Sequence, residues 1–141
     1  MADVTVTAAN VRAGDTTSGA NVTTVKAGET ITAGMSVYKK ASDSEYYKAD
    51  ANLSAEGAGS TDIAVALTNA GDGEPMVIQD KGVYTVGGTV TLGQIYVVSA
   101  TAGGIAPASD GASGWYTTIL GTAASATTIN LSPKVTGYLR A

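Results

Sequence analysis

The stretch VYTVGGTVTLGQIYVVS, residues 83–99, decides the fold class. It holds three short runs rich in valine, threonine, tyrosine and isoleucine, at 83–86, 89–92 and 94–99, and glycines separate them. Side chains that are branched at the β-carbon or aromatic favour extended backbone, and glycines between such runs are typical of turns. This part of the chain therefore predicts three short β-strands with tight connections.

The same pattern extends outward in both directions. Further runs occur at 29–32, 35–38, 63–67, 76–79, 115–120, 127–131 and 135–139. Valine and isoleucine together number 21 against 6 leucines, so extended backbone is favoured nearly everywhere. Ten short runs at this spacing predict an all-β protein, a compact β-barrel or β-sandwich of short strands.

Composition removes most enzyme mechanisms. The chain has 141 residues, of which 62 are Ala, Gly or Thr, and it contains no His, Cys or Phe. The usual imidazole base, thiolate nucleophile and soft metal ligands are therefore missing. We predict a protein that is not an enzyme and uses no cofactor.

Charge and hydropathy limit the partners and the compartment. The net charge of -4 and the scattered basic residues give no basic stripe, so we expect no nucleic-acid partner. No apolar run approaches the ~20 residues that span a bilayer, and the first ten residues, MADVTVTAAN, do not resemble an export signal. We expect no membrane partner and synthesis in the cytoplasm.

The chain divides into a short N-terminal region and one domain. Residues 1–25 hold two Thr/Val-rich stretches around a loose glycine-containing segment, which predicts an extended N-terminal arm. Residues 26–141 are predicted to form a single β domain. The alternative for the first region is an ordinary first hairpin of the barrel.

Two parts of the sequence repeat. TITAG at 30–34 returns as TVTLG at 89–93, 59 residues later, and a tyrosine follows each copy. IAVALTNAGDGEPMVI from residue 63 aligns with YTTILGTAASATTINL from residue 116, at an offset of 53. The two offsets differ by what one loop could absorb, so we predict two related β-units. The alternative is chance similarity in a chain rich in Ala, Thr and Gly.

Candidate catalytic and metal-binding groups lie in turns. The carboxylate pairs are Asp43 with Glu45 and Asp72 with Glu74, and each has Ser or Gly between its members. Turns favour these residue types for backbone reasons alone, and the segment at 69–75 lacks the distal glutamate of a calcium loop. Lysines at 39–40 beside serines at 42 and 44 sit in a charged segment, where a lysine base is not expected. We predict no catalytic residue and no metal site.

The second half of the chain is nearly uncharged. Between residues 82 and 139 the only acidic or basic side chains are Asp110 and Lys134. Centres of protein interfaces are depleted of charge in this way, whereas a surface of Thr, Ser, Gly and Asn is the alternative. Candidate interface residues are aromatic anchors in this half and valines of the arm. They are Trp115, Tyr116, Val4, Val6, Val11, Val22 and Val25.

Four segments taken in order resemble a known family. They are AGETITAGMSVY (27–38), IAVALTNAGDGEPMVIQDKG (63–82), TLGQIYVVSATAGGIAP (91–107) and TILGTAASATTINL (118–131). Their succession resembles the small capsid decoration, or cement, proteins of tailed bacteriophages. Asp62 stands where that pattern has a glycine, and the N-terminal arm has no counterpart in it.

The resemblance implies a structural virion protein. It implies a compact β domain, often a homotrimer, that binds the major capsid protein on the outer surface of an assembled capsid, at threefold or quasi-threefold positions, and stabilises it. It implies no catalysis. The alternative is a carbohydrate-binding or adhesive module of a virion fibre, with Trp115 and Tyr116 as the sugar platform.

Overall fold

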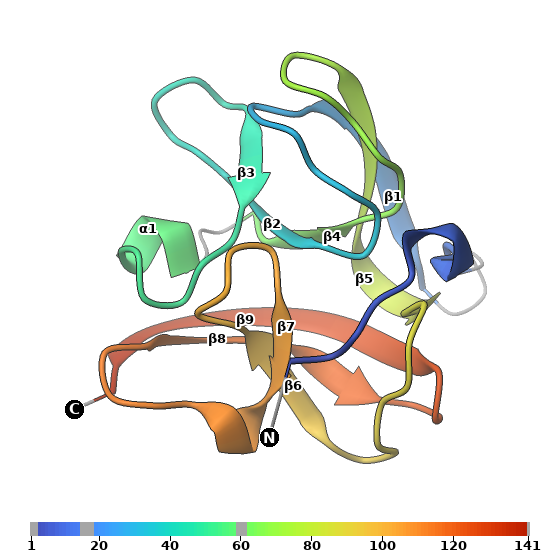
Figure 1. Ribbon diagram of the computed structural model, residues 1–141, viewed down its shortest axis with the longest axis vertical. Coiled ribbons are helices and arrows are strands. Elements are labelled where there is room, and N and C mark those ends of the chain that lie inside the picture. Colours follow the sequence, from blue (N-terminus) through green and yellow to red (C-terminus); the bar gives the residue numbers. More distant parts are fainter. Residues whose placement is uncertain (1–2, 15–18, 59–61, 141) are drawn as a thin grey trace.

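The computed structural model describes residues 3–14, 19–58 and 62–140, and it confirms an all-β fold. Nine antiparallel strands form a strongly curled sheet (Figure 1). The strands are β1 Asn21–Lys26, β2 Ser36–Lys39, β3 Tyr46–Lys48, β4 Ala64–Ala66, β5 Pro75–Thr85, β6 Ile95–Val98, β7 Ile105–Pro107, β8 Tyr116–Ala123 and β9 Thr128–Leu139. The helical elements described are short: α1 Ala55–Ala58 and the 3-10 turns η1 Ala8–Asn10 and η3 Ala108–Asp110.

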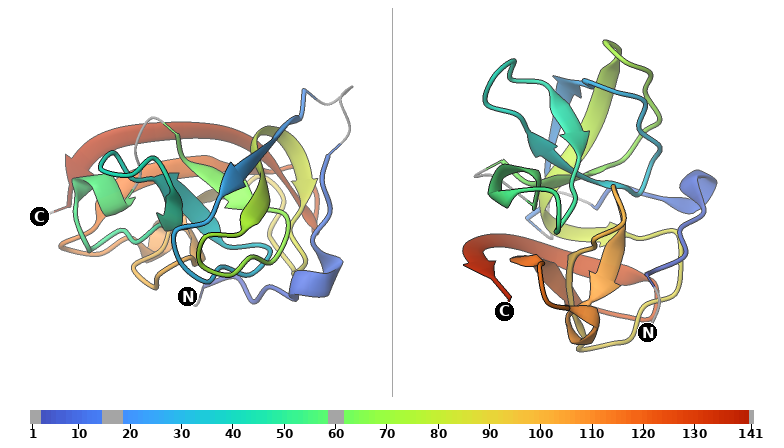
Figure 2. Two further views of the ribbon diagram at one scale, coloured as in Figure 1. Left: turned by 90° about the horizontal axis from the view of Figure 1, so that it is seen from above. Right: turned by 60° about the vertical axis from the view of Figure 1, so that its left-hand side comes forward.

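The long strand β5 belongs to two five-stranded units. In the first unit, residues 21–85, the strand order is β3-β2-β4-β5-β1. In the second unit, residues 75–139, the order is β7-β6-β8-β9-β5. The last strand of the first unit therefore serves as the first strand of the second, and the two orders are the same. The right-hand view of Figure 2 shows the units as an upper and a lower group of strands.

Strand registers confirm the internal repeat at the offsets that the sequence predicts. The pair Lys26 and Pro75 between β1 and β5 corresponds to Thr85 and Thr128 between β5 and β9, at offsets of 59 and 53. Pairing between β2 and β3 returns between β6 and β7 at an offset of 59 for both strands. The register departs from the repeat at β8, where bulges interrupt its pairing with β6 and β9.

The first unit closes on itself around a small core. Ala27, which follows β1, is bridged to Tyr46 of β3, and Gly28 N donates a hydrogen bond to Tyr46 O at 2.8 Å. Small side chains fill much of the interior. The buried residues of this first core are Ala27, Ile31, Val37, Tyr46, Ala64, Ala66, Ala70, Met76 and Ile78.

The larger core lies between the two units. Its members from the second unit occupy the positions equivalent to the first core: Val86 corresponds to Ala27, Tyr96 to Val37 and Ile129 to Met76. The outer side of the first unit covers this core, as it contributes Tyr38 and Val65. The second unit is therefore completed by contacts from outside its own strands.

The N-terminal segment supplies the remaining cover. Residues 3–14 run along the second unit, and Val11 is buried in the larger core with 6% of its surface exposed. Residues 21–26 form β1 inside the first unit. In this structure the described part of residues 1–25 thus lies on its own domain, and the expected boundary at residues 25–26 falls within β1.

Candidate partner-binding surface

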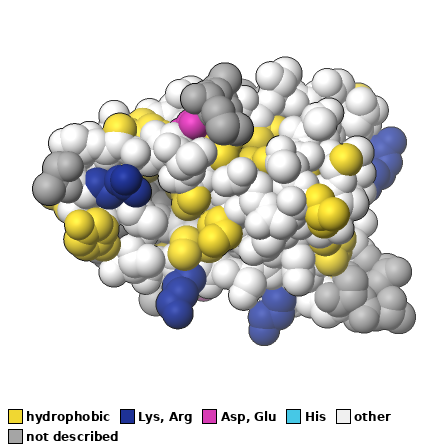
Figure 3. Space-filling model, turned by 90° about the horizontal axis from the view of Figure 1, so that it is seen from below, with side chains coloured by type: hydrophobic (Ala, Val, Ile, Leu, Met, Phe, Trp, Pro, Cys, Tyr) yellow, Lys and Arg dark blue, Asp and Glu magenta, His cyan; other side chains and the backbone are white. Residues whose placement is uncertain are grey.

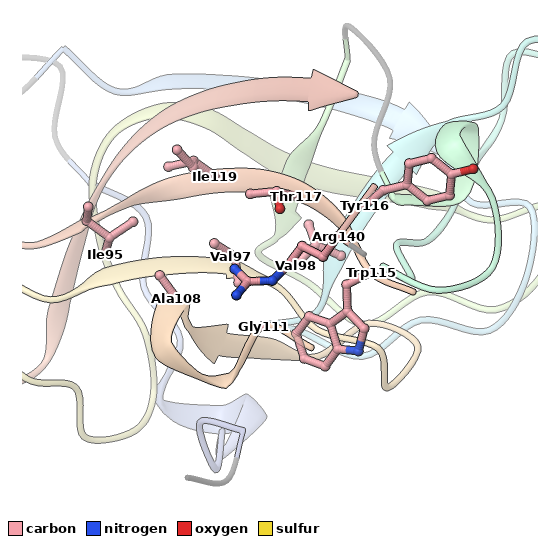
Figure 4. A pocket seen from close by; sticks show the side chains of 10 residues that line it. All are labelled: Ile95, Val97, Val98, Ala108, Gly111, Trp115, Tyr116, Thr117, Ile119 and Arg140. Atoms are coloured by element: carbon pink, nitrogen blue, oxygen red, sulfur yellow. The ribbon is translucent and has the colours of Figure 1, made fainter. Parts of the chain in front are cut away.

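The outer face of the second unit carries apolar side chains, among them Ile95, which is 44% exposed. Alternate side chains of a strand point to opposite faces. Tyr96 and Val98 of β6 face the larger core, whereas Ile95 and Val97 line a hollow on the outer side with Ile119 of β8 (Figure 4). We call this surface, with the residues around the hollow, the outer face.

The hollow has a volume of about 130 Å³ and one charged side chain among its lining residues. The residues that line the hollow are Ile95, Val97, Val98, Ala108, Gly111, Trp115, Tyr116, Thr117, Ile119 and Arg140. The backbone of Arg140 is fixed beside Trp115, since its N donates to Trp115 O at 2.8 Å and its O accepts from Gly114 N at 2.9 Å. The wall is otherwise neutral, so an apolar partner loses little polar solvation on binding there.

Exposed large hydrophobic side chains gather in the same half of the molecule. Figure 3 shows the side on which the second unit lies, with apolar side chains across a largely uncharged surface and basic ones toward its edges. Seven large hydrophobic residues are exposed among those described, and five belong to the second half. They are Leu92, Ile95, Val135, Tyr138 and Leu139, against Val22 and Leu53 elsewhere. Exposed apolar side chains gathered in one half of a molecule are a feature of binding surfaces when they form a patch, so this half is the candidate.

The repeat explains why these positions are apolar. Val97 is equivalent to Tyr38, and Ala108 to Ala49, at the offset of 59. In the first unit Tyr38 and Ala49 are buried against the second unit. In the second unit Val97 is also buried, with 5% of its surface exposed, whereas Ile95 on the same strand is 44% exposed.

The structure separates the predicted interface residues into three groups. Trp115 and Tyr116 both line the hollow, but their rings point in different directions (Figure 4), so they do not form one flat platform. The valines at 4, 6 and 11 pack against the larger core. Val25 packs against the first core, and Val22 is 45% exposed on β1.

Sequence reasoning missed Ile95, Val97 and Ile119 as residues that line the hollow, where Ile95 is 44% exposed and Val97 is 5% exposed. The signal was present in the run IYVV at 95–98, which is apolar at every position. A strand with one solvated face needs apolar side chains only at alternate positions. Four in succession indicate a strand that is covered on both faces.

The carboxylate pairs serve local structure. Asp43 accepts hydrogen bonds from Tyr47 Oη at 2.6 Å and from Glu45 N at 2.9 Å. The Tyr47 hydrogen bond, followed by that from Glu45 N, lowers the pKa of Asp43, and the same bond raises the pKa of Tyr47 to about 12. A carboxylate held ionised in this way is poorly suited to act as a general acid.

The other candidates are similarly engaged. Glu45 forms a 3.6 Å ion pair with Lys26, and Glu74 accepts a hydrogen bond from Gly71 N at 2.6 Å across its turn. Lys40 lies 4.9 Å from the centre of the Tyr47 ring, on the surface. Within residues 3–14, 19–58 and 62–140, no three acidic side chains are grouped as a metal site would require.

Two further observations complete the description. No helix in the described ranges is long and apolar enough to cross a membrane. Comparison of the chain with protein-family models, with curated proteins and with solved structures found no match. The geometry of the outer face therefore carries the functional argument.

Proposed function

We propose that this protein is a structural component of a phage virion that binds the outer surface of the assembled capsid and stabilises it. Its partners are the major capsid protein, at threefold or quasi-threefold positions, and other copies of itself in a homotrimer. The proposal combines the succession of sequence segments with one structural observation, the apolar and nearly uncharged outer face. Such a face suits a protein that works by being held between neighbours.

Multivalency supports this role physically. A trimer that engages several capsid subunits at once gains strength through effective concentration, so each contact can be modest. Shallow apolar surface around Ile95 and Trp115, with a hollow of about 130 Å³, is enough for one such contact. Asp43, Glu45 and Glu74 are engaged in local hydrogen bonds and an ion pair, which supports a role without catalysis.

The test places a charge on the outer face. Ile95 is 44% exposed there, so Ile95→Arg leaves the cores intact and introduces a charge that must be desolvated on binding. Leu53→Arg is the matched control, because Leu53 is an exposed apolar residue of the first unit at 65%. We expect Ile95→Arg to lose co-sedimentation with undecorated capsids while Leu53→Arg binds like the parent chain. Equal binding by all three proteins would reject the outer face as the capsid site.

A second candidate function is carbohydrate binding. The observation that favours it is Trp115 beside Arg140 at one end of the hollow, because a sugar ring can stack on an indole while a guanidinium donates to its hydroxyls. A glycan array with the parent chain and Trp115→Ala separates the two functions. A glycan signal that the substitution abolishes supports a sugar site, and no signal from either protein supports the capsid role.

A further inference from the structure

The two units differ at the seam where the sheet would close. In the first unit, Tyr46 O accepts a hydrogen bond from Gly28 N. The repeat places Ile105 and Gly87 at the equivalent positions of the second unit, 59 residues later. There the N-terminal segment lies between them: Val4 N donates to Ile105 O at 2.8 Å, and Thr7 N donates to Gly87 O at 2.9 Å.

The seam of the second unit is shaped to admit this segment. A Cβ at Gly88 would overlap the carbonyl oxygen of Thr5, and a Cβ at Gly87 would lie 2.7 Å from Thr7 O. Adjacent glycines are used where another backbone must approach closely. The seam therefore accepts a strand in the manner of a groove that takes an extended peptide.

Side chains at the beginning of the segment fix its position. Ser99 Oγ lies 2.7 Å and 2.8 Å from the two carboxylate oxygens of Asp3, and Ser99 is only 1% exposed beneath it. Val4 and Val6 pack against the larger core. At the other end, Arg12 and Thr85 exchange two backbone hydrogen bonds of 2.9 and 3.1 Å.

The segment lies outside the repeat and is joined to it by a connection. Residues 13–20 link Arg12 to β1, and eight residues can span roughly 26–29 Å when extended. The contacts described above depend on residues 3–12 and on the second unit, whichever chain supplies the segment. The same bonds would form if a neighbouring chain provided it, which is the condition for exchange of an element between copies.

We infer that the seam between β7 and residues 87–88 is a strand-acceptor site, and that its partner is a second copy of this chain, whose residues 3–12 occupy it by exchange. Exchange takes Val4, Val6 and Val11 away from the larger core until an equivalent segment replaces them, so it requires local opening of that core while the pairing among β1 to β9 is kept. Each exchange links two copies through backbone hydrogen bonds. This inference concerns contacts between copies and is independent of capsid binding.

The experiment uses two single-cysteine chains, because the natural sequence contains no Cys. One chain carries Asp3→Cys and the other Ser99→Cys, and they are mixed, incubated and oxidised before their disulfide-linked products are identified by mass. A disulfide between the two chains requires that the Ser99→Cys chain releases its own segment, since position 99 is covered. We expect this heterodimer in several-fold excess over that from a control mixture of Leu53→Cys with Ser99→Cys.

A second pair guards against disturbance of the Asp3 contact. Thr5 and Thr89 are exposed and line the same groove, so Thr5→Cys and Thr89→Cys chains are mixed and joined by a short bifunctional thiol reagent. Excess heterodimer from either pair supports exchange. Heterodimer at the control level from both pairs overturns it, and because no capsid is present the result does not depend on the proposed function.

Discussion

The first and second units share one strand order and largely one register, yet they reach a finished structure differently. The first unit closes through Ala27, Gly28 and Tyr46. The second takes the segment of residues 3–7 into the equivalent seam through two backbone hydrogen bonds, and the first unit covers its core. A repeated topology therefore does not determine how each unit is closed. The unit that needs contacts from outside its own strands is also the unit with the exposed apolar residues of the outer face.

Side-chain size at several equivalent positions is one physical difference between the two units. The first core contains Ala27 and Val37 where the larger core has Val86 and Tyr96, and Val25 beside the first core is replaced by Tyr84. Larger interior side chains need a wider enclosure, because protein interiors are packed to nearly constant density. We infer that the larger side chains at 84, 86 and 96 widen the second unit, although Ile105 is smaller than Tyr46 at the equivalent position, and that residues 3–7 lie between its edges for this reason.

The largest expected effect tests whether the two units form one cooperative body. Met76 and Ile129 are fully buried at equivalent positions, and Met76→Ala or Ile129→Ala should each lower the free energy of unfolding by about 2–5 kcal/mol. Because β5 belongs to both sheets, urea unfolding should show one transition by circular dichroism and by the fluorescence of Trp115, which lies in the second unit. Two separate transitions would show that the units are independent.

A smaller effect tests the size argument at the closed seam. Ala27 is fully buried, so Ala27→Val overpacks the first core and should lower the free energy of unfolding by about 1–3 kcal/mol in urea denaturation. Ala41→Val is the control, because Ala41 is exposed and substitutions there should stay within about 0.5 kcal/mol. If Ala27→Val were as stable as the parent, the first core would have spare volume and the explanation by side-chain size would fail.

Two tyrosines of the larger core should respond with opposite signs. Tyr96 Oη accepts a hydrogen bond from Thr91 N at 2.9 Å, so Tyr96→Phe should lower the free energy of unfolding by about 0.5–1.5 kcal/mol. Tyr84 Oη is buried without a partner among the described residues, so Tyr84→Phe should raise it by about 1 kcal/mol. Thermal and urea unfolding of both variants measure this, and a destabilised Tyr84→Phe would indicate a partner for that hydroxyl.

The smallest effect is a loss of stability in alkaline solution. Burial, with a contribution from Asp62 and Asp80, raises the pKa of Tyr46 from 10.0 to about 12. The unfolded chain therefore releases this proton at a lower pH than the folded chain, and the free energy of unfolding falls as the pH rises from about 10 toward 12. Urea midpoints across this interval should fall less steeply for Tyr46→Phe than for the parent, and identical slopes would contradict the assignment.

Much of the fold is predictable from local pattern. Glycine-separated β-branched runs locate β2, β4, β6 and β8 and parts of β5 and β9, whereas the runs at 29–32 and 89–92 form no strand. The repeat at offsets of 59 and 53 relates the pairing of β1 with β5 to that of β5 with β9, once the pairing is known. The role of β5 as a member of both units is not visible in the sequence, because a long strand and two short ones have the same local pattern. Bulges in β8 also escape prediction, since they arise from curvature that the whole sheet imposes.

The candidate surface is less accessible to sequence reasoning. Charge depletion points to the half of the chain that carries the outer face, and Trp115 and Tyr116 line its hollow. The faces of β6 cannot be assigned without knowing which side the first unit covers. The valines at 4, 6 and 11 illustrate the same difficulty, because an alternating Val/Thr segment fits the chain's own seam and a neighbour's sheet equally well.

The central claim is that the outer face of the second unit is where partners bind. Hydroxyl-radical footprinting of the protein, free and on undecorated capsids, measures this directly through side-chain reactivity. We predict that capsids protect Ile95, Trp115 and Leu139 while Leu53 of the first unit keeps its reactivity. Protection of Leu53 with unchanged reactivity at Ile95 and Trp115 would contradict the account.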